Sequence, residues 1–309
     1  MSPVLALIIT NAIWGGAAPI FKFALTNIPP FTLAFVRFFF ASFLFIPFIL
    51  KTNVKKITFR DWFQILLGSF FGIFINITFF FWGLQRSESI NAPIIASTGP
   101  LFIFLFSVII LREKPRKRVL GGMLISFLGA LLIIASPVVF GGEKTNVAAF
   151  EGNLMFVLAT LGYVLSPIFL KKVLKKINPY FVSFVSFLFS ALIFLPLAIN
   201  EQSVWSLSKL NLAGITGIIY GVFFSSAVAY FLFYYGLSKI PAQEVGIFTY
   251  LDPVTAILIA APLLQEYPSV YFIIGSVLVF GGILISEGRF HYHPIFKLFK
   301  RRTETKLIS

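Results

Sequence analysis

The sequence predicts an all-α integral membrane protein with ten transmembrane helices, arranged as two inverted five-helix repeats. Three observations predict it: an apolar composition, an internal duplication and a one-sided distribution of positive charge. Hydrophobic residues make up 58% and charged residues 12% of 309 positions, and the charged share is about half that of a soluble domain. The mean hydropathy is +0.94. Segments this apolar are long enough, at 1.5 Å per residue, to cross the ~30 Å hydrocarbon core of a bilayer.

Ten spans are expected between clusters of charge, Pro, Asn and Gly, which end or interrupt helices. The first span has no positively charged segment before it, and more apolar residues follow its Pro19. We therefore interpret it as a retained helix and not as a cleaved signal peptide. In chain order the expected spans are 4–25, 31–50, 62–84, 91–111, 118–136, 151–170, 180–199, 211–237, 243–264 and 269–287.

The chain contains an internal duplication with two offsets. At an offset of 149, Pro30, Phe38, Phe45 and Pro47 recur as Pro179, Phe187, Phe194 and Pro196; at 153, Gly68, Pro100, Glu113, Gly122 and Gly129 recur as Gly221, Pro253, Glu266, Gly275 and Gly282. The duplication predicts a first repeat over 1–142, a second over 150–288 and a basic cytoplasmic tail over 289–309. Because each repeat has five spans, an odd number, the second enters the membrane in the opposite orientation.

Positive charge is concentrated on one side of the predicted topology. With both termini inside, 20 of the 25 Lys and Arg residues fall in cytoplasmic segments, and Arg86, Lys144 and Lys209 fall in external loops. This bias follows the positive-inside rule and places both termini in the cytoplasm, with the chain in the cell (inner) membrane. The net charge of +14 therefore indicates topology and attraction to anionic lipid, and no nucleic-acid partner is expected.

The composition excludes several kinds of site. The chain has no cysteine, and its two histidines, His291 and His293, lie together in the tail, so we expect no metal site and no cofactor. No phosphate-binding loop of the Walker type is present. One mid-membrane acid, without a histidine or cysteine in any span, is too little for a membrane-embedded enzyme.

Among the charged residues inside the expected spans, three are candidates for a role in transport: Arg37, Asp252 and Lys22. Arg37 and Asp252 lie at overlapping depths, and each charge costs about 2.5–3.5 kcal/mol on insertion scales, so each needs pairing, water or a function. We expect both to face a cavity, with Arg37 attracting a substrate carboxylate and Asp252 engaging a substrate amine, a proton or Arg37. The alternatives are a structural ion pair or a protonated Asp252. Lys22 is a second candidate for coupling, and snorkelling to the headgroups also explains it.

Uncharged polar groups and prolines inside spans complete the predicted pathway. Half of the polar groups could instead form helix-to-helix hydrogen bonds, and packing kinks are the alternative for the prolines. The predicted pathway residues are Trp14, Asn76, Ser97, Thr98, Ser225, Ser226, Tyr230 and Tyr234 beside Arg37 and Asp252, and the predicted hinges or kinks are Pro19, Pro100, Pro167 and Pro253. Gly122 with Gly129, and Gly275 with Gly282, are expected to allow close helix packing, within one chain or between two.

The order and duplication of these motifs resemble the EamA branch of the drug/metabolite transporter superfamily, over about residues 3–288. Asn11-Ala12-Ile13-Trp14-Gly15 with Lys22 resembles its first-helix signature, Arg37 falls where the family places an arginine, and Leu161-Gly162-Tyr163 is a weaker copy of the Trp14 motif. Gly99-Pro100-Leu101 through Glu113 to Gly129 resembles the end of one repeat, and Tyr250-Leu251-Asp252-Pro253-Val254 through Glu266 to Gly282 the end of the other.

The resemblance implies a carrier with a central cavity that opens alternately to either side and moves metabolites such as amino acids without ATP. We therefore expect a secondary transporter, with export the favoured direction, and not an enzyme. A lipid or nucleotide-sugar carrier of the same fold is the alternative, followed by a non-transporting membrane scaffold. The expected partners are a small-molecule substrate, the lipid bilayer and protons as the coupling ion, with the chain a monomer or a weak homodimer.

Overall fold

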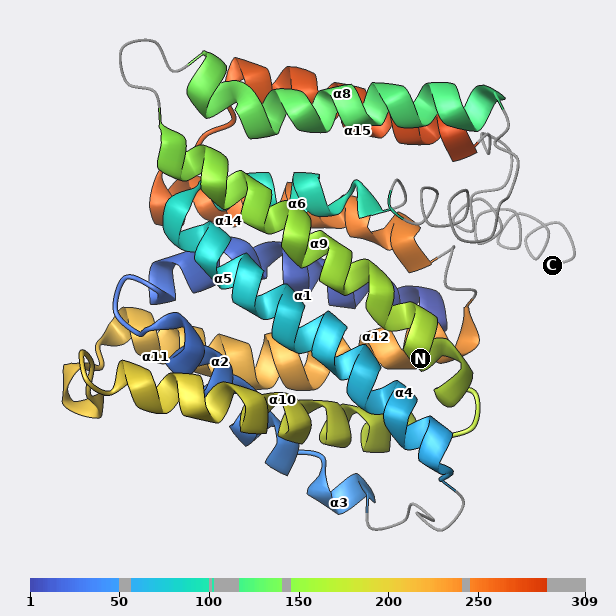
Figure 1. Ribbon diagram of the computed structural model, residues 1–309, viewed down its shortest axis with the longest axis vertical. Helices are drawn as coiled ribbons and strands as arrows, with labels where there is room; N and C mark the ends of the chain where they lie inside the picture. The colour runs from blue at the N-terminus through green and yellow to red at the C-terminus, as the bar shows by residue number, and fades with distance from the viewer. Residues whose placement is uncertain (50–56, 100–101, 103–116, 141–145, 241–244, 288–309) are drawn as a thin grey trace, which may run out of the picture.

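The computed structural model describes residues 1–49, 57–99, 102, 117–140, 146–240 and 245–287, and within these ranges it is helical without strands (Figure 1). The helices are α1 (Pro3–Ala24), α2 (Pro30–Phe43), α3 (Ile46–Ile49), α4 (Phe59–Ser69), η2 (Phe70–Ile75), α5 (Asn76–Arg86), α6 (Asn91–Ala96), α8 (Lys117–Val139), α9 (Val147–Val173), α10 (Pro179–Glu201), η3 (Leu207–Lys209), α11 (Leu212–Ile219), η4 (Tyr220–Val228), α12 (Ala229–Lys239), η5 (Gly246–Leu251), α14 (Asp252–Leu264) and α15 (Val270–Glu287).

The all-helical prediction is confirmed for the described residues. Six helical stretches have the length and apolar character to cross a bilayer: Pro3–Ala24, Phe59–Arg86, Leu120–Val139, Val147–Val173, Pro179–Glu201 and Leu212–Lys239. Three apolar helices are shorter: Pro30–Phe43, Phe248–Leu264 and Val270–Ile285. Most of the expected span 91–111 lies outside the described residues, as does the tail, so ten spans remain a prediction.

Helix boundaries fall where local capping groups occur. Ser2 accepts a hydrogen bond from the backbone N–H of Leu5 at the start of α1, and Thr58 and Asp61 form a capping box at the start of α4. Such caps satisfy backbone N–H groups that have no partner within the helix. The expected span 31–50 breaks after Phe43, because the ring of Pro47 would clash with a carbonyl one turn earlier, and α3 restarts with Pro47 in its first turn.

Helix contacts occur in reciprocal pairs between the two halves. Helix α1 packs on α12 and α14 of the second half, and its counterpart α9 packs on α5 and α6 of the first. Helices α2 and α10 pack on each other, as do α8 and α15, which form one edge of the molecule (Figure 1). Each contact thus has an equivalent with the halves exchanged.

Repeat mates meet near the centre of this arrangement. Phe38 and Phe187, which the 149-residue offset relates, have ring centroids 5.5 Å apart. Trp14 and Tyr163, related by the same offset, make an edge-on contact at 6.2 Å. Residues related by the duplication touch where an internal pseudo-two-fold axis would cross the molecule, so the duplication organises the packing as well as the sequence.

Glycines allow α8 and α15 to approach closely within one chain. A Cβ added at Gly129 would lie 2.6 Å from the carbonyl oxygen of Gly275, and one added at Gly275 would lie 2.8 Å from that of Gly129. A Cβ at Gly282 would collide with the carbonyl of Gly122 and lie 2.5 Å from the backbone nitrogen of Ser126. These small residues therefore act inside the chain, as close backbone packing in membranes requires.

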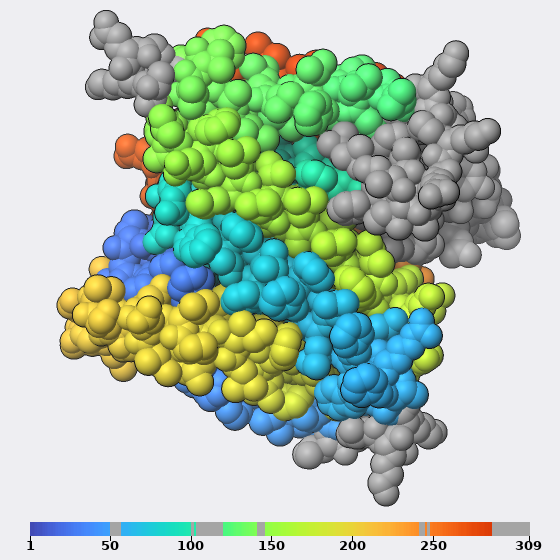
Figure 2. Space-filling model, viewed as in Figure 1, coloured from blue at the N-terminus to red at the C-terminus, as the bar shows by residue number. Residues whose placement is uncertain are grey.

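The outer surface of the helices is apolar. In Figure 2, α8 forms the upper edge of one face, and α10 with α4 and α5 covers the lower part. Exposed side chains on this surface include Leu124, Phe127 and Leu128 of α8 and Leu192 and Ile199 of α10. A soluble monomer rarely exposes so continuous an apolar surface, whereas hydrocarbon favours it.

We expect Gly129→Ala and Gly282→Ala to destabilise the fold by about 1–3 kcal/mol, because the added methyl group meets backbone atoms that move only if the helices separate. Gly121 and Gly281 are matched controls, since a Cβ at either meets nothing within 4 Å. Gly121→Ala and Gly281→Ala should leave stability unchanged or raise it. Thermal unfolding of purified protein in detergent measures both pairs, and equal melting temperatures would contradict the packing argument.

Candidate functional site

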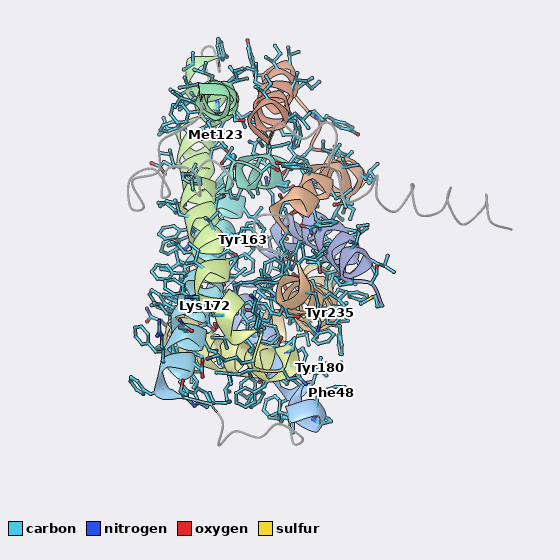
Figure 3. The ribbon with its side chains drawn as sticks, turned by 90° about the vertical axis from the view of Figure 1, so that its right-hand side faces the viewer. Phe48, Met123, Tyr163, Lys172, Tyr180 and Tyr235 are labelled. Carbon is cyan, nitrogen blue, oxygen red and sulfur yellow. The ribbon has the colours of Figure 1, made fainter. Side chains whose placement is uncertain are left out.

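A cavity of about 120 Å³ lies between the two halves. In Figure 3, Tyr163 lies at mid-height of the molecule, between Met123 of α8 and Tyr180 of α10. Six of the predicted pathway residues line the cavity: Trp14, Arg37, Asn76, Ser225, Tyr230 and Asp252. The remaining lining residues are Ala17, Ala18, Phe21, Ile77, Phe80, Ala92, Pro93, Ala96, Phe156, Ala159, Thr160, Tyr163 and Thr249.

Asp252 reaches the cavity because α1 and α14 touch. A Cβ at Gly15 would lie 2.7 Å from the Cα of Asp252, so only glycine permits this approach. Asp252 begins α14, after the 3-10 segment Gly246–Leu251. Its Oδ1 is buried and accepts no hydrogen bond from the described residues.

Arg37 is 1% exposed and is held by four side chains. Its Nε donates to Ser226 Oγ at 2.7 Å, and its Nη2 donates to Ser225 Oγ at 3.1 Å. The guanidinium carbon lies 4.7 Å from the ring centroid of Phe21 and 4.6 Å from that of Phe38, within cation–π range. Nη1 has no hydrogen-bond partner among the described residues.

Arg37 and Asp252 line one cavity without forming an ion pair. The ion pairs within the described part of the chain are Lys22 with Glu266 and Lys176 with Asp61. The cavity therefore contains one cation and one acid, each with an atom that lacks a partner among the described residues. A molecule with complementary charges could satisfy both.

The aromatic side chains direct their polar atoms at the backbone. Trp14 Nε1 donates to the carbonyl of Ser225 at 3.1 Å, and the hydroxyl of Tyr230 to that of Gly72 at 3.5 Å. Tyr220 donates from its hydroxyl to the carbonyl of Ile13 at 2.6 Å. These donors are used within the protein, so Trp14 and Tyr230 offer mainly ring surface to the cavity.

Two π-helical segments lie beside the cavity at equivalent places in the repeats. Segment η2 interrupts the helix 59–86, and η4 interrupts the helix 212–239. The carbonyl groups that accept from Tyr230 and Trp14 belong to Gly72 and Ser225, which the 153-residue offset relates. π segments frequently mark functional sites, and here they supply carbonyl oxygens that fix the aromatic rings.

Several predicted residues lie away from the cavity. Ser97 and Thr98 are buried and donate to the carbonyls of Pro93 and Ile95, four and three residues earlier in the same segment, and not to another helix. Tyr234 packs behind the lining, with its ring centroid 6.0 Å from that of Tyr230.

Of the predicted kink residues, Pro19 and Pro167 lie inside α1 and α9. Pro253 lies in the first turn of α14, where a missing N–H costs little, and Pro100 lies outside the described residues.

Lys22 belongs to a polar network at one end of the cavity. Its Nζ lies 2.6 Å from Glu266 Oε1 and donates to the carbonyl of Ser87 at 2.7 Å. Glu266 Oε2 accepts from the N–H and hydroxyl of Ser89 at 2.7 and 2.6 Å and from the N–H of Ile90 at 3.4 Å. The network joins α1, the α5–α6 connection and the α14–α15 connection.

A second acid lies beside this network. Partial burial and then the charge of Glu266 raise the pKa of Glu88, while the ammonium of Lys22 acts in the opposite direction. The carboxylates of Glu88 and Glu266 repel each other, and both are stabilised by the single ammonium of Lys22. Removing the charge of Lys22 would therefore leave two like charges close together without a cation between them.

Lys171 is the repeat mate of Lys22 and is bound in a related way. Its ammonium donates to the carbonyls of Leu237 and Ile240, at the end of α12. Ile240 is the mate of Ser87, so both lysines bind the end of the equivalent helix. Of these two lysines, only Lys22 also has a carboxylate partner among the described residues, Glu266.

Sequence reasoning missed part of the site. Phe80, Phe156 and Thr160 line the cavity, but nothing in their spacing distinguishes them from lipid-facing residues. Tyr163 was detectable, because it occupies the position of Trp14 in the second repeat. Glu266 was detectable as an acid present in both repeats.

Comparison with known proteins gives consistent results across the chain. A family model described as the EamA-like transporter family matches residues 1–135 and 150–287. The uncharacterized transporter YetK of Bacillus subtilis is 30% identical over 288 residues, 93% of this chain and 87% of the relative. An S-adenosylmethionine uptake transporter of Rickettsia bellii is 26% identical, with 84% of each chain covered. A solved structure with 19% sequence identity superposes with a TM-score of 0.62, over 92% of this chain and 96% of the solved chain. This similarity shows a shared fold.

We expect Ser226→Ala to destabilise the protein by about 1–3 kcal/mol, because it leaves the buried Nε of Arg37 without an acceptor. Ser183 is a matched control: it is equally buried, and its hydroxyl has no partner among the described residues. Ser183→Ala should be neutral or stabilising. Thermal unfolding in detergent compares the two variants, and equal losses would show that the Arg37 contact contributes nothing specific.

Proposed function

The chain belongs to the EamA-like transporter family, and we propose that it is a secondary transporter that moves small metabolites such as amino acids by alternating access, without ATP. Proteins of this family are multi-pass membrane transporters and not enzymes. The observation that carries the proposal is the cavity between the halves, in which Arg37 and Asp252 remain unpaired with each other.

In this proposal the two charges bind the two ends of a zwitterion. Arg37 Nη1 donates to the substrate carboxylate, and Asp252 Oδ1 accepts from or neutralises its cationic group. A buried charge without a partner is costly, so a substrate that satisfies both gains affinity that an uncharged solute lacks. The proton is the second occupant of Asp252, and its exchange with substrate would couple transport to the proton gradient.

We propose that the ten spans form inverted repeats over 1–142 and 150–288. In this arrangement the chain lies in the inner membrane of the cell, with both termini and the tail 289–309 in the cytoplasm. The reciprocal helix contacts support this arrangement. Alternating access is then a rocking of one half against the other about a site near the midplane. The direction of transport that we propose is export, as the resemblance to the family implied.

The relatives suggest one probe substrate. S-adenosylmethionine, named for the uptake transporters, has an amino acid head group that fits the charges of Arg37 and Asp252. The alternatives of the same fold are less well supported: a nucleotide-sugar or lipid phosphate carrier needs several cations in the cavity, and Arg37 is the one cationic residue among those that line it.

Closing one end of the cavity is the proposed role of the Lys22–Glu266 network. Lys22 adjoins Phe21, and Ile90 lies two residues before Ala92; Phe21 and Ala92 line the cavity. The network thus closes the end at which α14 connects to α15, on the left in Figure 1, and the predicted topology makes this end external. Access from that side requires the ion pair to separate.

Counterflow into proteoliposomes tests the transport proposal. We expect saturable exchange of an amino acid or of S-adenosylmethionine, and Arg37→Gln should raise KM about ten- to hundredfold, because it removes a charge-assisted hydrogen bond. Lys176→Gln is the control, since Lys176 pairs with Asp61 outside the cavity. Non-saturable flux would indicate a channel, and exchange that does not respond to Arg37→Gln would mean that the site is misplaced.

Cysteine labelling tests the closure. The chain lacks cysteine, so Ala92→Cys places a single thiol in the cavity wall. Glu266→Gln should speed alkylation by a membrane-impermeant reagent about fivefold, as expected when about 1 kcal/mol that favours the closed state is lost. Glu201→Gln is the matched control: Glu201 accepts hydrogen bonds from Phe31 and Thr32 without a lysine partner among the described residues. Equal rates in all three backgrounds would disprove the closure.

A further inference from the structure

We propose that this cavity selects substrates with a methylated organic cation, such as a quaternary ammonium or a sulfonium group, with Asp252 as the counter-charge and aromatic ring faces as the surrounding surface. The inference rests on the proposed transport function and specifies its substrate class. It depends on three features of the cavity: an unpartnered acid, a cation that is already stabilised, and aromatic rings, two of which, Trp14 and Tyr230, already use their polar hydrogens on backbone carbonyls.

Asp252 supplies the charge that lacks compensation. Its Oδ1 is buried without a hydrogen-bond partner among the described residues, and the described ion pairs involve other residues. A cationic ligand would therefore remove the largest unbalanced charge in the cavity.

Arg37 is unsuitable as that counter-charge, because its own contacts already stabilise it. Two serine hydroxyls accept from Nε and Nη2, and the guanidinium lies within 4.7 Å of two phenylalanine ring centroids. Moving it to Asp252 would break all four contacts. Its remaining free atom, Nη1, fits a weaker contact to a ligand carboxylate.

The aromatic residues present ring surface beside this acid. The indole N–H of Trp14 and the hydroxyl of Tyr230 are bound to backbone carbonyls. Trp14 meets Tyr230 and Tyr163 edge-on, with interplanar angles of 71° and 88° and centroid distances of 5.0 and 6.2 Å. Because these rings are tilted against one another, their π faces can contact a cation in the cavity from different sides. Aromatic groups arranged in this way bind quaternary cations.

Much of the lining is apolar surface, which accepts no hydrogen bond from a primary ammonium. Such a group has three N–H donors that need acceptors when buried, whereas a methylated cation has none. Asn76 and Thr160 donate their N–H and O–H to the carbonyls of Ala159 and Phe156, so of these two polar groups only the side-chain oxygens remain, as acceptors. The rest of the wall is largely alanine and phenylalanine. Methyl groups on the cation match this surface better than N–H groups.

Matched ligand pairs test the inference with purified full-length protein in nanodiscs, by calorimetry. Glycine betaine and 3,3-dimethylbutanoate have the same shape and the same carboxylate but differ in the central positive charge. Choline and 3,3-dimethylbutan-1-ol differ in the same way and lack the carboxylate. We expect each cation to bind at least about tenfold more tightly than its carbon isostere, and betaine to bind more tightly than glycine.

Two variants assign the preference to the proposed groups. Asp252→Asn should reduce choline to about the affinity of 3,3-dimethylbutan-1-ol and leave that uncharged alcohol unchanged, and it should remove the preference for betaine over its isostere. Trp14→Leu should reduce the preference about threefold or more. Asp61→Asn is the matched control, because Asp61 pairs with Lys176 outside the cavity. Thermal unfolding confirms that each variant is folded, and the Asp61 variant should retain the full preference.

Several outcomes would overturn the inference: equal binding of cation and isostere, a preference that survives Asp252→Asn, tighter binding of glycine than of betaine, or no binding of either cation. Counterflow of an amino acid that depends on Arg37, without any cation preference, would sustain the transport proposal and reject this inference. Tight choline binding through Asp252, with betaine binding that ignores Arg37→Gln, would support the inference and reject the carboxylate role of Arg37.

Discussion

A charge inside a bilayer is stable only where the protein replaces the water it has lost, and the burial of Arg37 is the case on which most of the central structure depends. Its guanidinium connects α2 to two serines of η4 and lies between the rings of Phe21 and Phe38. One side chain thereby joins both halves of the molecule beside the cavity. The same requirement explains why the nearby indole and phenol groups bind backbone carbonyls.

The duplication supplies the frame, and the departures from it supply the chemistry. Mates such as Phe38 with Phe187 are the same residue type and contact each other near the centre. The two charged residues of the cavity, Arg37 and Asp252, have no charged equivalents. Ser186, the mate of Arg37, accepts a hydrogen bond from Ser69, and the mate of Asp252 is Gly99. The first half therefore supplies the only cationic residue among those that line the cavity, Arg37, and the second half supplies the only acidic one, Asp252.

The network around Lys22 shows the same combination of symmetry and departure from it. Both repeat-mate lysines bind backbone carbonyls at the end of an equivalent helix. Lys22 also binds Glu266, whose other oxygen accepts from Ser89. The two ends of the bundle thus differ in the described structure although their sequences are related, and a carrier needs such a difference between its two sides in any one state.

The sequence by itself determined the apolar, membrane-type character of the chain, most helix boundaries and the duplication, because these depend on composition, capping residues and position along a helix. Only the tertiary structure decided which residues share the cavity. Ser97 and Tyr234 lie at plausible depths yet face elsewhere, whereas Tyr163 and Phe156 line it. Helices that are apolar on every side have no periodic signal to indicate which face is inward. The partner of Lys22 was hidden for the same reason, since an ion pair between Lys22 and Glu266 depends on how α1 and α14 pack and not on spacing within either.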